Sequence, residues 1–258
     1  MTRTHNTRFR VLYGLVAGVG VVLLLIAVYQ LTQNQVSRPW VVLSLLTLVA
    51  GSLSLKIPGV AGRVCMGDAL ISLSVLLCGP LPGAVTAALE GIAGSLRCRN
   101  TSRRLQFVVF NAGVMALSAY AAGKVFFAAL GQPTLHSGNI PTAGSLPGPL
   151  LAFAAVYFVV NTLLVAAASA LDRSDKIFQT WWRGFAWTSV NCVAAAFVAG
   201  MLVQSEYPLA LSGVVVLIVG SVAVYLNARA HVRLAHEVEQ QQAQPAGSAA
   251  KTAGGASA

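Results

Sequence analysis

The sequence predicts an all-α fold, a polytopic transmembrane helix bundle of about eight helices. Hydrophobic residues make up 56% of the 258 residues and charged residues only 9%, and the mean hydropathy is +0.73. A soluble domain usually carries about 25% charged residues. Because this number of charged residues is too small to cover a water-exposed surface, most of the outer surface must face lipid. Apolar runs close to the ~20 residues that a transmembrane helix needs recur along the whole chain.

Eight apolar segments can be recognised between the basic N-terminus, residues 1–10, and residue 228. The first extends from Val11 to about Leu31, which is longer than the 7–15 apolar residues typical of a signal peptide, and we interpret it as a retained anchor. Segments one, five, six, seven and eight are long enough to span a membrane. The eight segments cover approximately residues 11–31, 40–55, 65–78, 81–96, 105–130, 149–171, 184–204 and 208–228.

The third and fourth segments are short and are joined by Gly79-Pro80-Leu81-Pro82-Gly83. Two prolines and two glycines within five residues end a helix, because proline removes a donor and clashes with the preceding turn. The freed backbone groups cannot face hydrocarbon. The turn therefore either reaches the far interface or is buried among other helices, and the pair is either two thin spans or a re-entrant hairpin.

The positions of the basic residues predict the orientation. With the N-terminus in the cytoplasm, the loops on the outer side carry only Arg38, and Lys124 lies within the fifth segment, where we expect it to reach for the interface. The other fifteen of the seventeen basic residues fall inside, as the positive-inside rule requires. Those fifteen are Arg3, Arg8, Arg10, Lys56, Arg63, Arg97, Arg99, Arg103, Arg104, Arg173, Lys176, Arg183, Arg229, Arg233 and Lys251.

The region after the eighth segment is predicted to lie in the cytoplasm. Residues 229–242 are good helix formers that continue the last segment as an exit helix, so residues 220–242 could bind a cytoplasmic partner or a second copy of the chain. Residues 243–258 are rich in Gly, Ala and Ser and are predicted to be disordered. The whole chain is expected in the inner membrane of a bacterium, with both termini cytoplasmic.

No motif indicates an enzyme, a metal site or a bound cofactor. The sequence has no P-loop, HExxH or GxSxG pattern, and its four cysteines form no CxxC pair. We expect the glycines Gly14, Gly18 and Gly20 to allow close helix packing. The basic group between the fourth and fifth segments is interpreted as a topology determinant that contacts anionic lipid, without nucleic-acid binding; it consists of Arg97, Arg99, Arg103 and Arg104.

Two acidic residues fall in the short segments. Asp68 lies about ten residues before the Gly-Pro turn and Glu90 about eight after it, so an antiparallel hairpin would place them at similar depth. Ionisable groups at membrane depth are costly and usually face a bundle interior or a wet cavity. The acids are therefore candidates for a shared ligand or proton site. The alternative is that both lie at the cytoplasmic interface and neutralise nearby arginines.

Three asparagines lie in long apolar stretches, one in each of segments five, six and seven. Asn111, Asn161 and Asn191 could form interhelical hydrogen bonds, which contribute about 0.6–2 kcal/mol each. They could instead line a small polar cavity, and together with Asp68 and Glu90 they form the candidate ligand-binding set.

The stretch from Ser54 to Ala84, with the run Leu105–Asn111, the run Asn161–Val165 and the helix after Tyr225, resembles a known family. It is similar to the multi-helix membrane sensor region that precedes GGDEF or HD-GYP output domains in bacterial signalling proteins. No GGDEF or His-Asp signature is present, so the resemblance implies sensing without cyclic-dinucleotide chemistry. It predicts a stand-alone sensory or regulatory membrane module without a catalytic output domain.

A second resemblance supports an alternative function. Gly67-Asp68, the Gly79–Gly83 turn and Gly91-Ile92-Ala93-Gly94 are similar to substrate-binding subunits of energy-coupling-factor transporters. That resemblance implies a small-molecule uptake subunit with Asp68, Glu90 and Asn111 near the ligand. The family usually has about six helices, and the additional segments here depart from it.

Overall fold

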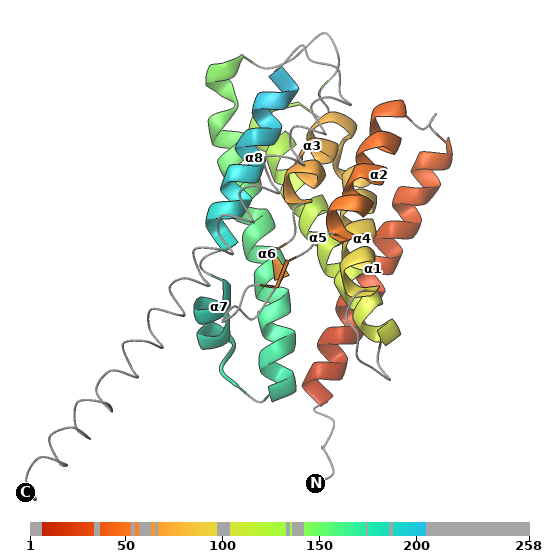
Figure 1. Ribbon diagram of the computed structural model, residues 1–258, viewed down its shortest axis with the longest axis vertical. Helices are drawn as coiled ribbons and strands as arrows, with labels where there is room; N and C mark the ends of the chain where they lie inside the picture. Colours follow the sequence, from red (N-terminus) through yellow and green to blue (C-terminus); the bar gives the residue numbers. More distant parts are fainter. Residues whose placement is uncertain are drawn as a thin grey trace, which may run out of the picture.

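The computed structural model describes residues 7–33, 37–52, 55–56, 63–64, 67–96, 104–132, 135, 142–173, 175–185 and 188–204. Within these residues the chain is helical apart from one pair of very short strands, which confirms the all-α class (Figure 1). The elements are α1 (Thr7–Gln33), α2 (Arg38–Ser52), β1 (Leu55–Lys56), β2 (Arg63–Val64), α3 (Asp68–Cys78), α4 (Pro80–Leu96), α5 (Arg104–Leu130), η1 (Ala143–Ser145), α6 (Pro147–Arg173), α7 (Ile177–Phe185) and α8 (Thr188–Gln204).

Three of the described helices are long and apolar enough to cross a membrane. They are Thr7–Gln33, Leu105–Leu130 and Pro147–Arg173, which correspond to α1, α5 and α6. The helices α2, α3 and α8 are apolar but shorter. Because water-soluble chains do not carry several such helices, these three indicate a membrane protein.

Each predicted apolar segment up to residue 204 contains a helix, but one boundary is wrong. The segment predicted at 184–204 is divided: α8 begins at Thr188, and residues 177–185 form the separate helix α7. Trp181 and Trp182 therefore lie in α7, where the Trp181 indole donates a 2.8 Å hydrogen bond to Thr162 of α6. The eighth segment, the exit helix and the tail, residues 208–258, lie outside the described residues, as does Trp187.

Neighbouring helices mostly run in opposite directions. Helices α3 and α4 form an antiparallel hairpin, α4 runs antiparallel to α5, and α5 runs antiparallel to α6 (Figure 1). Helices α1 and α5 run in the same direction and meet where Gly20 lies against Gly113, so closely that a Cβ on Gly20 would lie 2.5 Å from the Gly113 Cα. Of the three glycines predicted to pack closely, only Gly20 does, since Gly14 and Gly18 have open space around them.

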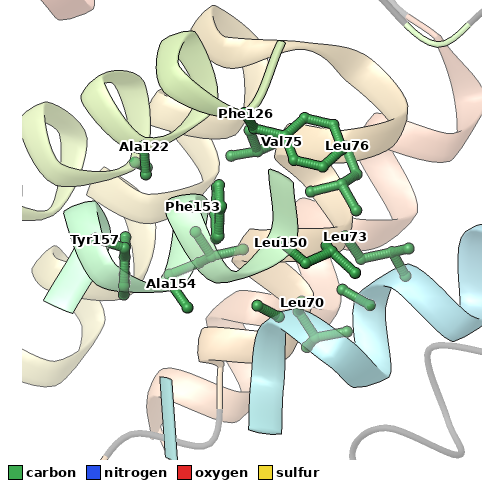
Figure 2. Close-up of a cluster of buried hydrophobic side chains, with 14 of the residues drawn as sticks. Leu70, Leu73, Val75, Leu76, Ala122, Phe126, Leu150, Phe153, Ala154 and Tyr157 are labelled. Atoms are coloured by element: carbon green, nitrogen blue, oxygen red, sulfur yellow. The ribbon is translucent and has the colours of Figure 1, made fainter. Parts of the chain in front are cut away.

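Helix α3 lies at the centre of the fold. Every residue from Leu70 to Leu76 is buried, and α3 contacts α2, α4, α5 and α8. Figure 2 shows the apolar cluster around it, in which Leu76 of α3 lies near Phe126 of α5 and Leu73 lies near Leu150 of α6. The rings of Phe126 and Phe153 meet edge to face at 6.4 Å. A short helix is thus enclosed by protein on all sides.

Candidate functional site

The Gly-Pro turn between α3 and α4 is partly buried: Gly79 and Gly83 are buried, and the residues between them are half-buried. Gly79 has φ +97°, a conformation that favours glycine. A Cβ on Gly123 of α5 would lie 3.1 Å from the Cβ of Pro80, so the turn packs against α5 seven residues before that helix ends at Leu130. At 1.5 Å per residue the turn stops about 10 Å short of the end of α5.

A side chain from α2 bonds to the first turn of α4. The indole Nε1 of Trp40 donates a 3.0 Å hydrogen bond to the carbonyl oxygen of Pro82. The same carbonyl, in the first turn of α4, also accepts from the Thr86 hydroxyl at 3.2 Å, so Trp40 fastens the start of α2 to the start of α4.

A cavity of about 750 Å³ lies above the turn, and we call it the hairpin cavity. Its floor is Gly79 to Pro82, and its walls come from the end of α1, the start of α2 and the last three turns of α5. Ligand pockets typically measure about 300–1,000 Å³. Polar side chains from three helices reach it, and the main ones are Gln30, Trp40, Tyr120 and Lys124.

The two predicted acids lie near the opposite end of the hairpin. Glu90 of α4 is 1% exposed, and its carboxyl group packs directly on Gly67, so any side chain at position 67 would collide with it. Asp68, the first residue of α3, is the next residue after Gly67. The two acids are therefore held at the same level of the hairpin, as their spacing from the turn predicted.

Asp68 is held by α6. The hydroxyl group of Tyr157 donates a hydrogen bond to Oδ1 of Asp68 at 3.2 Å and lies 3.9 Å from the sulfur of Met115 in α5. Tyr157 is ten residues from the start of α6 and sixteen from its end, about 15 Å and 24 Å along the helix. Asp68 consequently lies beside the middle part of α6.

A cluster of buried hydroxyl groups joins α2, α3 and α4, and sequence reasoning missed it. The hydroxyl of Thr86 lies 3.1 Å from that of Ser44 and 2.9 Å from that of Ser74, and all three side chains are at most 6% exposed. Isolated Ser and Thr residues in an apolar run carry little signal, because such a hydroxyl often bonds only to its own helix. Here it is the parallel packing of α2 and α4 that brings them together.

The structure does not bring the three predicted asparagines together. Asn111 donates a 2.7 Å hydrogen bond to Ser95 of α4, and it also lines a second cavity of about 220 Å³ between α1, α5 and α6. Asn161 and Asn191 are half-buried in α6 and α8, and neither makes a hydrogen bond among the described residues. Asn111 thus combines both predicted roles, and none of the three lies in the hairpin cavity.

Most of the predicted lipid-contacting group lies outside the described residues. This holds for Arg97, Arg99 and Arg103, while Arg104 begins α5. No cluster of three or more His, Cys, Asp or Glu side chains occurs in the described part of the chain. The two cysteines described there, Cys78 and Cys192, are free thiols, and Cys78 lies on the wall of the hairpin cavity.

Comparisons with known proteins do not assign the chain to a class. No protein family model, curated protein or solved structure matches it.

Proposed function

We propose that this chain is a multi-pass membrane protein that recognises a small molecule within its helix bundle and acts as a sensory or regulatory module. The observation that carries the proposal is the buried α3–α4 hairpin, which has a ligand-sized cavity on its turn and two acids at its other end. A ligand on the turn would press on an element that four other helices enclose. Such an element can transmit a change in packing across the bundle.

The proposal includes about eight helical segments in the bacterial inner membrane, with both termini in the cytoplasm. Its support is the separation of positive charge along the bundle. The starts of α1 and α5 and the end of α6 lie at one end of the molecule, whereas Arg38 begins α2 at the opposite end (Figure 1). The first group carries Arg8, Arg10, Arg104, Arg173 and, just beyond α6, Lys176. By the positive-inside rule, this distribution supports a cytoplasmic location for that end of the bundle.

Proximity labelling in cells tests the sensory role. A labelling enzyme fused after residue 258 is expected to mark a reproducible set of neighbours. Deletion of residues 229–258 should remove that set, and Asp68→Asn should change its composition while the amount of protein stays constant. Asp175→Asn is the matched control, because this acid is exposed between α6 and α7. Unchanged labelling in the deletion variant would contradict the proposal.

The second candidate function is a small-molecule uptake subunit, and the mid-bundle position of Asp68 and Glu90 favours it. Two acids at one level could bind a polar ligand or a proton during transport. The purified protein would then retain a small polar ligand in native mass spectrometry, and Asp68→Asn or Glu90→Gln would weaken its binding. If no ligand is retained and neither variant alters a thermal-shift response, the uptake function is wrong.

A further inference from the structure

We infer that the hairpin cavity binds an amphipathic anion, a carboxylate or phosphate on an apolar body, with the anionic group beside Lys124. This inference rests on the proposed function, because it names the chemical class of the molecule recognised there. It assigns Lys124 a role that the sequence alone did not suggest, since a lysine near a helix end is expected simply to reach for the interface.

The charge of the cavity points to an anion. Lys124 is the one charged side chain among the described residues that line it. At the same end of the bundle, the start of α2 adds Arg38. The four described acids lie elsewhere: Asp68 and Glu90 in mid-bundle, and Asp172 and Asp175 at the opposite end. A positive group bordered by apolar walls attracts anions more strongly than the same group in open water.

A phenol lies beside the ammonium group of the cavity. Tyr120 and Lys124 are four residues apart on α5, so their side chains lie one above the other on the same face of that helix. A carboxylate or phosphate between them could accept from both the phenol and the ammonium group. The Trp40 indole is already committed to the carbonyl of Pro82 and holds the floor instead.

The cavity also offers apolar contact. Gln30, Ser37, Trp40 and Gln132 contribute further polar groups from α1, the start of α2 and the residues after α5. The apolar side chains are Ala27 and Leu31 of α1, Pro80 and Leu81 of the floor, and Phe127 and Ala128, which lie on the same face of α5 as Lys124. These groups offer contact area without hydrogen-bonding demands, as in most small-molecule sites, where a few polar groups set the orientation. A volume of about 750 Å³ admits either a free organic anion or the headgroup region of an anionic lipid.

Cys78 provides a reporter on the cavity wall. The chain has four cysteines, so replacing Cys65 and Cys98 by Ser and the buried Cys192 by Ala leaves one thiol. In nanodiscs of zwitterionic lipid, this thiol is labelled with an anionic sulfonatoethyl methanethiosulfonate or a cationic trimethylammonioethyl methanethiosulfonate. The rate with the anionic reagent is divided by the rate with the cationic reagent. This ratio is then corrected for the intrinsic reactivity of the reagents by dividing it by the same ratio for a free thiol in solution. Lys124→Gln is expected to lower the corrected ratio roughly fivefold, because removing one nearby positive charge slows the anionic reagent and speeds the cationic one.

Protection of Cys78 then identifies the ligand class. 4-Phenylbutyrate should slow labelling, whereas 4-phenylbutan-1-ol and 4-phenylbutylamine should not, and Lys124→Gln should remove the protection. If a lipid headgroup is the occupant, nanodiscs containing phosphatidylglycerol should protect Cys78 without any added compound, again only with Lys124 present. Either pattern supports the inference and tells the two sources apart.

Three results would overturn the inference: no labelling by either reagent, an unchanged ratio in Lys124→Gln, or protection by the amine equal to that by the carboxylate. None of these depends on partners in the cell. They are therefore distinguishable from failure of the sensory role, which is read from the neighbours marked after deletion of residues 229–258.

Discussion

The phenol of Tyr157 and the carboxyl group of Asp68 are joined by a 3.2 Å hydrogen bond across 89 residues of sequence. The same phenol ring stacks on Phe153, one turn away in α6, with the two planes only 5° apart. Tyr157 is 2% exposed, so the bond is made inside the core. It connects the start of the central helix α3 to the long helix α6.

Tyr157→Phe is expected to lower the free energy of unfolding by about 1–2 kcal/mol, because it removes the hydroxyl donor and leaves the Asp68 oxygen without that bond. The measurement is an unfolding titration of the purified protein in detergent. Tyr29→Phe is the control, since Tyr29 is 65% exposed. Equal stability of the two variants would show that the Asp68 bond contributes nothing.

Gly67→Ala tests the contact with Glu90. The added methyl group would collide with the Glu90 carboxyl group, so we expect a loss of about 1–3 kcal/mol, typical of overpacking. In a Glu90→Ala background the same change should cost far less, because the obstacle is gone. Gly94→Ala on α4 meets no atom within 4 Å and serves as the control. A cost of Gly67→Ala that is independent of residue 90 would contradict the contact.

Thr86→Val tests the hydroxyl cluster. It removes the group that Ser44 and Ser74 both bond, and we expect a loss of about 2 kcal/mol from polar groups left buried without that partner. The triple variant Ser44→Ala, Ser74→Ala and Thr86→Val should be nearly as stable as the wild type, because no hydroxyl then lacks a partner. Thermal unfolding in detergent measures the stability of the single and the triple variant. If the triple variant loses as much stability as the sum of its three single substitutions, the hydroxyls act separately.

Gly20→Ala tests the contact between α1 and α5. Its Cβ would fall against the Gly113 backbone, which cannot give way as a side chain can, so the two helices must separate at a cost of about 1–3 kcal/mol. Gly18→Ala, two residues earlier on the same helix, meets open space and should change stability by less than about 1 kcal/mol. Equal free energies of unfolding for the two variants would contradict the contact between Gly20 and Gly113.

The elements were predictable from sequence because lipid as a solvent leaves a strong pattern. Long apolar runs and the break at Gly79-Pro80 set most helix positions within a few residues. The start of α8 at Thr188 was missed because the glycine near the end of α7, Gly184, is only a weak helix breaker and Phe185 beside it is apolar. Hydropathy averages over a window and does not register a short interruption.

The candidate site was only partly predictable. The shared level of Asp68 and Glu90 followed from counting residues on either side of the turn. The partners of Asp68 did not, because Tyr157 and Met115 lie on helices that reach α3 only through tertiary packing. The hairpin cavity arises because the turn stops short of the end of α5, and no residue in the turn itself encodes that difference in length.

The enclosure of α3 has a consequence for how the protein is made. One of the helices that cover it, α8, begins at Thr188, more than a hundred residues after α3 ends at Cys78. During synthesis α3 is made well before α8. Until α8 is present, this apolar helix, which is too short to span the bilayer, must remain in contact with lipid or with the insertion machinery. Truncated chains that end before α8 should accordingly be captured by membrane quality-control proteases, whereas chains that include it should escape them.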